Sequence, residues 1–162
     1  MGLGLAGDHV QVRRATSDDL EALAASSAGL FAEDAASRDP LRDPNWPLRH
    51  AAADYARHLT NPDTLVLVAV QDAAVVGHLL GGFYEASAMW RSPRAYLISM
   101  FVQAPWRGAG VGSRFVADFS AWARGKGATQ LRVTAYSSNE GAVRFYRRHG
   151  FAPLESTFAL EV

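Results

Sequence analysis

Several short segments of the chain alternate apolar and polar residues or run as β-branched blocks, a pattern typical of β-strands. Residues 10–14 read Val-Gln-Val-Arg-Arg, and residues 64–70 are a block of Thr, Leu, Val and Ala. Because residues 71–73 provide a tight turn, we expect residues 75–84 to return as the second strand of a hairpin. The remaining strands are expected at residues 95–102, at 131–135 and, in the one place left for a further strand, within 152–162.

Other segments space their apolar residues three or four apart, as an amphipathic helix does. Residues 110–126 place Val111, Phe115, Phe119 and Trp122 on one face, which should pack on the sheet. Residues 48–59 also read as helical, and residues 140–149 follow a helix-capping Asn139.

The start of the chain predicts one more helix and then a break. Thr16 or Ser17 can cap a helix over residues 18–28. From residue 29 to residue 47 the periodicity is lost, and three prolines interrupt the segment. We therefore expect a mobile loop or a broken helix there.

The order of these elements favours an α/β fold. A strand, helices, an antiparallel hairpin and two strand-to-helix steps predict a mixed sheet with helices on both faces. The 162 residues are 49% hydrophobic and contain no repeat or linker, so a single domain over residues 1–162 is expected.

Charge and cysteine content narrow the function. Sixteen basic and sixteen acidic residues give a formal net charge of zero, which offers no overall field for nucleic acid or a membrane surface. The absence of cysteine excludes a cysteine nucleophile and thiolate metal ligands. His9, His50, His58 and His149 lack a metal-ligand spacing, so no metal is expected. No membrane span or signal peptide is visible, and we expect a cytoplasmic protein.

The most informative segment runs from Val102 to Ser113, where an apolar strand enters a glycine-rich turn that opens a helix. Glycines allow close approach of a ligand to the backbone, and the first helical turn offers free N–H groups, so the segment predicts a phosphate site. Neither a nucleoside-triphosphatase loop nor the dinucleotide-binding glycine spacing is present. The pattern is Arg-x-x-Gly-x-Gly, from Arg107 to Gly112.

This pattern resembles the acetyl-CoA signature of the GNAT superfamily of N-acetyltransferases. A second segment strengthens the likeness: Asn139 opens a helix, Tyr146 follows two helical turns later on the same face, and Gly150-Phe151 closes the segment. The resemblance covers residues 10–151 and implies the GNAT acyl-CoA N-acyltransferase fold.

The resemblance implies how acetyl-CoA would be bound and used. Tyr146 would be the general acid that protonates the departing thiolate, and Asn139 would contact the pantetheine or cap its helix. Pro105 stands one place later than is usual in the family, which leaves the register of the Val102 contacts open. The other implied cofactor-binding residues are Met100, Phe101 and Val102 for the acetyl and pantetheine groups, and Arg107, Gly108, Ala109, Gly110, Val111, Gly112 and Ser113 for the pyrophosphate.

The general base is less clearly marked, because Thr134 stands where some family members carry a Glu. The candidates are Glu33, Asp34, Glu85 and His78, and a water chain is the alternative. For each of these side chains a structural role is also open: a solvated surface charge for the acids, and a hydrogen-bonded core residue for His78.

The acid-biased segment 33–43 favours a cationic acceptor. We expect Glu33 and Asp34 to bind a primary amine, with Trp46 or Tyr84 as an apolar wall. The substrate class would be a small aminoglycoside- or polyamine-like molecule. A protein N-terminus or lysine, and a non-catalytic acyl-CoA-binding module, are the alternatives, and the chain could act as a monomer or a homodimer.

Overall fold

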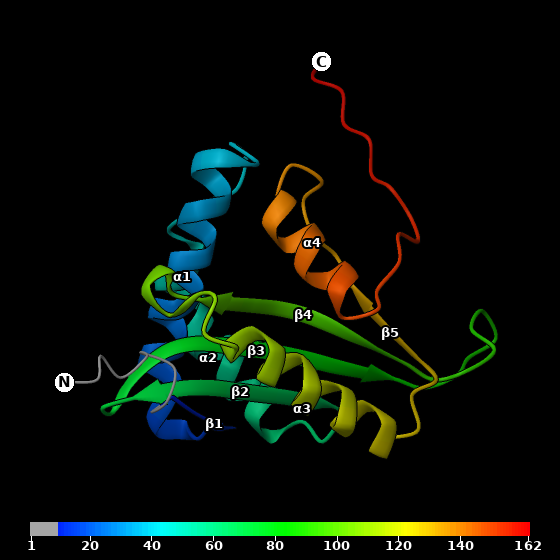
Figure 1. Cartoon of the computed structure of the whole chain (residues 1–162), viewed down its shortest axis with the longest axis horizontal. Helices are drawn as coiled ribbons and strands as arrows, with labels where there is room; N and C mark the ends of the chain where they lie inside the picture. The colour runs from blue at the N-terminus through cyan, green and yellow to red at the C-terminus, as the bar shows by residue number, and fades with distance from the viewer. Residues whose placement is uncertain (1–9) are drawn as a thin grey trace.

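A five-stranded mixed sheet forms the centre of the structure, a computed structural model that describes residues 10–162 (Figure 1). The strands lie side by side in chain order, the first four antiparallel and the fifth parallel to the fourth. The predicted α/β fold is therefore confirmed. The strands are β1 (Gln11–Arg14), β2 (Thr64–Gln71), β3 (Ala74–Tyr84), β4 (Arg94–Val102) and β5 (Gln130–Val133).

Helices cover both faces of this sheet (Figure 1). On one face, α1 (Leu20–Ser37) and α2 (Trp46–Thr60) bury Leu23 and Tyr55 against β2 and β3. On the other face lie α3 (Val111–Gly125) and α4 (Glu140–Arg148). The predicted stripe on α3 is confirmed, since Val111, Phe115 and Phe119 are buried in the main core and Trp122 packs against it. Two short 3₁₀ turns, Ser17–Asp19 and Ala104–Trp106, complete the elements.

Helix α1 continues nine residues beyond its predicted end at residue 28, so the expectation of an irregular segment from residue 29 is wrong up to Ser37. The predicted start of this helix at residue 18 lies close to the observed one, because Thr16 and Asp19 form a capping box just before α1 begins at Leu20. Gly29, which suggests a break in the sequence, lies inside the helix against β4. A Cβ there would be 2.9 Å from the Cε1 of Phe101, so any larger residue would have to displace this ring. Glu33 and Asp34 consequently stand on a helix.

The strand expected within residues 152–162 is also absent. This segment leaves α4 in an extended course away from the sheet (Figure 1). All of its residues are exposed, so no neighbouring strand pairs with it and no core residue covers it. None of the helices in residues 10–162 combines the length and apolar character that crossing a membrane requires.

Candidate active site

The site begins where strand β4 loses one of its two neighbours. β4 pairs with β3 along its whole length, from Arg94 to Val102. It pairs with β5 only as far as Leu97, which lies opposite Val133. An extra residue, Ile98, interrupts the register with β3 and forms a bulge, a feature that bends a strand. Within residues 10–162, the edge of β4 beyond this bulge therefore has no paired strand.

Backbone groups of Met100 and Val102 face this open edge. The carbonyl oxygen of Val102 accepts a hydrogen bond from the Nε of Arg107 at 2.7 Å, whereas the N–H of the next residue, Gln103, donates to Val76 in β3. Side-chain and backbone directions alternate along a strand, so Met100 presents its N–H and carbonyl to the same side as Val102. The arrangement leaves hydrogen-bonding groups for an extended ligand.

A glycine loop continues directly from this edge into α3. Gly108 and Gly110 have φ angles of 78° and 84°, in the left-handed region that favours glycine. A Cβ added at either position would meet nothing within 4 Å, so open space lies in front of the loop. Gly110 is the N-cap of α3 and no side chain caps that end. The free N–H groups of the first turn and the dipole of α3 fit a pyrophosphate.

The two sequence motifs dock onto each other through α3 and α4. A Cβ at Gly112 would lie 3.1 Å from the Cζ of Phe145, so the glycine lets the helices approach closely. The Nδ1 of His149 is 2.8 Å from the carbonyl oxygen of Phe145, and its Nε2 is 3.0 Å from the hydroxyl of Ser113. Because a carbonyl only accepts, a neutral His149 carries its proton on Nδ1 and accepts from Ser113. No local sequence pattern predicts this link between α3 and α4.

Tyr146 lies on α4 and packs edge-on against Phe145 and Phe151, with ring centroids 5.3 and 5.7 Å away. Burial raises the pKa of its hydroxyl to about 12. The phenol therefore keeps its proton throughout the neutral range and could serve as a proton donor. Asn139 caps the same helix, its Oδ1 accepting the N–H of Ala142 at 3.2 Å, which is one of its two predicted roles.

Glu33 and Arg107 meet across the open edge. The Nη2 of Arg107 lies 2.5 Å from the Oε1 of Glu33, and the guanidinium stands 5.3 Å from the ring centroid of Phe101. Both charged side chains are partly exposed. The structure thus brings one predicted acceptor residue and one predicted cofactor residue together, and it holds Glu33 in an ion pair.

Asp34, the neighbour of Glu33, is buried in an ion pair with Arg38 at 2.8 Å and does not meet Arg107.

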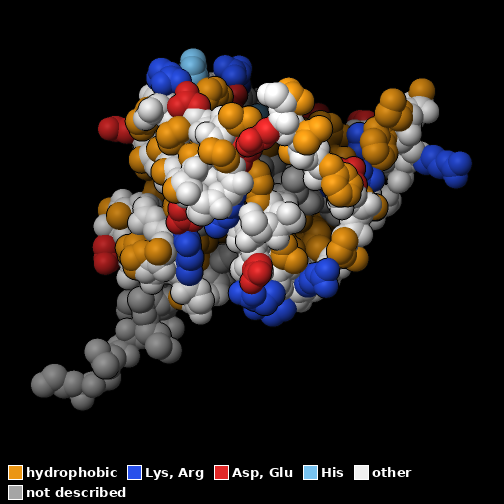
Figure 2. Space-filling view, turned by 90° about the horizontal axis from the view of Figure 1, so that it is seen from above, with side chains coloured by type: hydrophobic (Ala, Val, Ile, Leu, Met, Phe, Trp, Pro, Cys, Tyr) orange, Lys and Arg blue, Asp and Glu red, His pale blue; other side chains and the backbone are white. Residues whose placement is uncertain are grey.

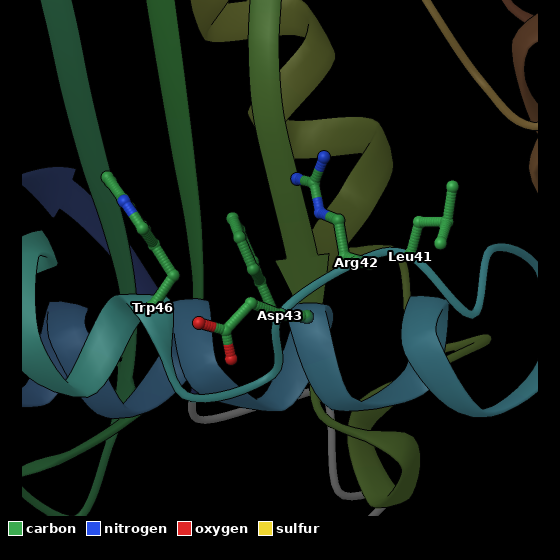
Figure 3. A pocket seen from close by; sticks show the side chains of 5 residues that line it. Leu41, Arg42, Asp43 and Trp46 are labelled. Carbon is green, nitrogen blue, oxygen red and sulfur yellow. The ribbon is translucent and has the colours of Figure 1, made fainter.

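Trp46 lines a shallow pocket between α1 and α2 (Figure 3). Its ring stacks on that of Phe31, with 5.6 Å between the centroids. The guanidinium of Arg42 also lies over Phe31, 4.0 Å from its ring centroid. Leu41 and Asp43 complete the lining. Trp46 thus supplies apolar surface to this pocket, in which Arg42 covers one face of Phe31, and no residue of the open edge of β4 lines it.

Tyr84 and Glu85 lie far from the glycine loop, toward the opposite end of the pairing between β3 and β4. Gly77 of β3 pairs with Val102 beside the glycine loop, whereas Tyr84 pairs with Arg94 eight residues earlier in β4. At about 3.3 Å per residue this separation is about 26 Å. Tyr84 is nearer to the start of the open edge, because its partner Arg94 precedes Leu97 by three residues, and its ring packs against Tyr96 at 5.3 Å between centroids. Glu85 is exposed and follows directly after the end of β3.

His78 is fully buried in β3 and links α1 to β4. Its Nδ1 lies 2.7 Å from the Oγ of Ser26 in α1, and its Nε2 lies 2.9 Å from the Oγ of Ser99 in β4. Burial lowers the pKa of His78 to about 4, so the imidazole is neutral at physiological pH. It is a hydrogen-bonded core residue. No sequence pattern singles out either serine, because only the fold brings residues so far apart into contact.

The face above the open edge mixes hydrophobic and charged side chains and is hollowed near its centre (Figure 2). Tyr136, from the segment after β5, reaches Asp39 beyond the end of α1, with 3.3 Å between its hydroxyl and the Oδ2. This contact joins the two walls of the site. In the part of the chain that the structure describes, no three His, Asp or Glu side chains gather as a metal site requires.

Sequence comparison agrees with this geometry. The model of the Acetyltransferase (GNAT) family matches residues 31–151, most of the chain. The chain therefore belongs to the GNAT acetyltransferase family, as its motifs predict. It is 31% identical over 80 residues to the thialysine N-epsilon-acetyltransferase of Bos taurus. That match covers 49% of this chain and 46% of the bovine protein, so it spans about half of the curated relative.

Solved structures share the fold. A mutant of the BH1408 protein from Bacillus halodurans matches with a TM-score of 0.85 and 18% identity, covering 94% of this chain and 99% of that one. The aminoglycoside N-acetyltransferase AAC(6')-Iy in complex with CoA matches with a TM-score of 0.75 and 18% identity, covering 95% of each chain. The predicted GNAT fold is confirmed by these matches.

Proposed function

We propose that the protein is an acetyl-CoA-dependent N-acetyltransferase that acts on a primary amine of a small cationic molecule. One observation carries the proposal: β4 keeps β3 as a neighbour but loses β5 after Leu97, and its open edge leads into the glycine loop. The pantetheine chain of acetyl-CoA can pair with the backbone of Met100 and Val102 while its pyrophosphate binds at the start of α3. Membership of the GNAT family supports the same ligand.

Acetyl-CoA would supply the thioester carbonyl that an amine attacks. The residues for its pyrophosphate are Gly108 to Ser113, whose backbone is open to the ligand. The backbone N–H groups on the open edge of β4 would stabilise negative charge on the carbonyl oxygen. These are the same residues that the family resemblance assigns to the cofactor.

Tyr146 is the proton donor in this proposal. Its raised pKa keeps the hydroxyl protonated, and it stands on the face of α4 that packs toward the core beside α3. Proton transfer from such a group to a leaving thiolate contributes about 10²–10⁴-fold to rate.

The acceptor would enter between α1 and the segment after β5. Glu33 and Asp39 supply negative charge on these walls, and Trp46 supplies apolar surface. Glu33 is the best placed candidate to bind or deprotonate the amine, because it meets Arg107 across the open edge, whereas Asp34 is buried in an ion pair with Arg38. Amine acetyltransferases among the similar proteins, named for thialysine and for aminoglycosides, support an amine acceptor.

A non-catalytic acyl-CoA-binding module is the second candidate. Thr134 stands where a base occurs in some relatives and is exposed, and Glu33 is held by Arg107. Such a module would bind acetyl-CoA through the same loop without turning it over.

Free-thiol release from acetyl-CoA, measured against a panel of amines, separates these functions. We expect release with small polyamines or aminoglycosides and little with peptides that present a free N-terminus or lysine. Preference for the peptides would overturn the small-molecule assignment. Tight acetyl-CoA binding by calorimetry with no release for any amine would establish the binding module instead.

A further inference from the structure

Two arginines, Arg94 of β4 and Arg132 of β5, lie close together on the face of the sheet opposite α3. The residues next to them in their strands, Ala95 and Leu131, pack in or against the main core, so the two arginine side chains point to the other face. Both guanidinium groups lie over the ring of Trp90, with the Cζ of Arg94 3.9 Å and that of Arg132 4.7 Å from the ring centroid. Two positive charges thus share one small area of the surface.

Neither arginine has an acidic partner within residues 10–162, where the ion pairs of the protein involve other residues. Arg132 donates to two neutral oxygens, the Oε1 of Gln130 at 2.7 Å and the hydroxyl of Tyr96 at 3.3 Å. The Nε and Nη1 of Arg94 are buried and have no hydrogen-bond partner. Buried polar groups are nearly always hydrogen-bonded, and two neighbouring cations repel each other, so this cluster is suited to an anionic group.

The loop between β3 and β4 holds Trp90 over the two arginines. Ser87 and Trp90 exchange backbone hydrogen bonds at 2.8 and 3.1 Å, which close a turn. At the end of the loop, the N–H of Thr129 donates to the carbonyl oxygen of Pro93 at 3.0 Å, and the hydroxyl of Thr129 lies 2.9 Å from that of Ser92. The loop lies at the end of the sheet farthest from α1 (Figure 1). Its hydrogen bonds therefore fix the position of Trp90 without help from that helix.

An apolar side chain connects this cluster to the open edge of β4. Ile98, the bulge residue at which the edge opens, is 47% exposed. A Cβ at Gly82 would lie 3.0 Å from the Cδ1 of Ile98, so Ile98 leans along this face toward Tyr96, the residue that pairs with Gly82. Arg132 lies opposite Tyr96, two residues before Ile98, which is about 7 Å along the strand. A short aliphatic chain spans this distance.

We propose that Arg94 and Arg132 bind a carboxylate of the acceptor, so that the substrate is an amino acid whose side chain ends in a primary amine. This inference rests on the proposed function and narrows its class of small cationic amines. The amine would meet the acetyl group at the open edge of β4, and the methylene chain would lie on Ile98. The carboxylate would accept hydrogen bonds from the guanidinium groups, whose planar fork of donors matches its geometry.

Free lysine and cadaverine, which is lysine without its carboxylate, are matched probes for this site. In thiol release from acetyl-CoA, the KM for lysine should be lower by about tenfold or more, because hydrogen bonds to a charged group are lost with the carboxylate. Equal KM values for the two amines would overturn this inference and leave the proposed function standing. No release with any amine would overturn both.

Substitution of the arginines locates the carboxylate. Arg94→Gln and Arg132→Gln should each raise the KM for lysine and leave the KM for cadaverine no higher than in the wild type, because cadaverine has only positive charge to place there. Arg132→Glu should reverse the preference in favour of cadaverine. Arg91→Gln, at an exposed arginine of the same loop, is the matched control and should change neither KM. Variants that lose both amines equally would show that the arginines are structural.

Trp90 provides a test that does not depend on turnover. Because its ring covers Arg94, a carboxylate that reaches the buried Nε and Nη1 has to displace the ring. Titration of lysine into the protein with CoA bound should change the tryptophan fluorescence. The change should be lost in Trp90→Phe and should not occur with cadaverine. The same response to both amines, or no response to lysine, would contradict carboxylate binding at this place.

Discussion

Arg107 and Glu33 form an ion pair that ties the glycine loop to α1, with 2.5 Å between Nη2 and Oε1. The same guanidinium donates to the carbonyl oxygen of Val102 on the open edge of β4. A ligand pairing with that edge competes with Arg107 for Val102. We therefore expect acetyl-CoA to displace Arg107 and to release Glu33 for the acceptor.

Glu33→Gln tests the role of this carboxylate. If Glu33 binds a cationic amine, the substitution should raise the KM for the amine several-fold and leave the KM for acetyl-CoA within about twofold, because lost ground-state binding appears in KM. Glu21→Gln, on the exposed first turn of α1, is the matched control. A fall in turnover with a flattened rise of rate with pH would instead identify Glu33 as the base.

Gly110→Glu should abolish binding of acetyl-CoA, since it places negative charge and bulk at the uncapped start of α3. Gly127→Glu is a matched control: Gly127 also has a positive φ, of 94°, and open space for a Cβ, but it follows the far end of α3. Calorimetry should show loss of binding only in the first variant. Near-native affinity in a folded Gly110→Glu protein would remove the pyrophosphate from this loop.

Tyr146→Phe should lower turnover about 10²-fold or more and leave the affinity for acetyl-CoA nearly unchanged, because only the hydroxyl is lost. The pKa of about 12 means that the wild-type donor loses its proton near pH 12, above the usual value of 10.0. Its titration should therefore not reduce the rate up to pH 10. Tyr84→Phe is the control, and equal turnover in both variants would make Tyr146 structural.

Gly112→Ala should destabilise the contact between α3 and α4. Its Cβ would lie 3.1 Å from the ring of Phe145, and overpacking of this kind costs about 1–3 kcal/mol. In a Phe145→Leu background the same change should cost less, because the smaller side chain makes room. Urea unfolding of the four proteins measures this coupling, and simple additivity would show that the two residues do not interact.

His78 should make the free energy of unfolding depend on pH. Its folded-state pKa of about 4 lies below the ordinary 6.5, so between these values the unfolded chain binds more protons. Stability is therefore complete above pH 6.5 and falls as the pH drops toward 4. At about 1.4 kcal/mol per pH unit the loss approaches roughly 3 kcal/mol. Urea unfolding from pH 7 to pH 4 should show this fall, and His78→Gln should remove it.

The local patterns of the chain determined most of the fold. Apolar alternation placed β1 to β5 within one or two residues, and the stripe from Val111 to Trp122 identified the face of α3 that packs on the sheet. The glycine loop and the Asn139 helix identified the family. These features are readable because hydrogen bonding within a segment and burial of one face depend on neighbouring residues.

Tertiary packing decided what these local patterns could not. Phe101 of β4 packs closely against Gly29 inside α1, where the sequence suggests a break, and the fold buries the charged side chain of Asp34. The strand expected within residues 152–162 is absent, because this segment runs away from the sheet (Figure 1) and pairs with no strand, although the outer edge of β5 is unpaired within residues 10–162. The distances from Glu33 to Arg107, and from His78 to Ser26 and Ser99, likewise depend on how the chain returns to itself, which no local pattern encodes.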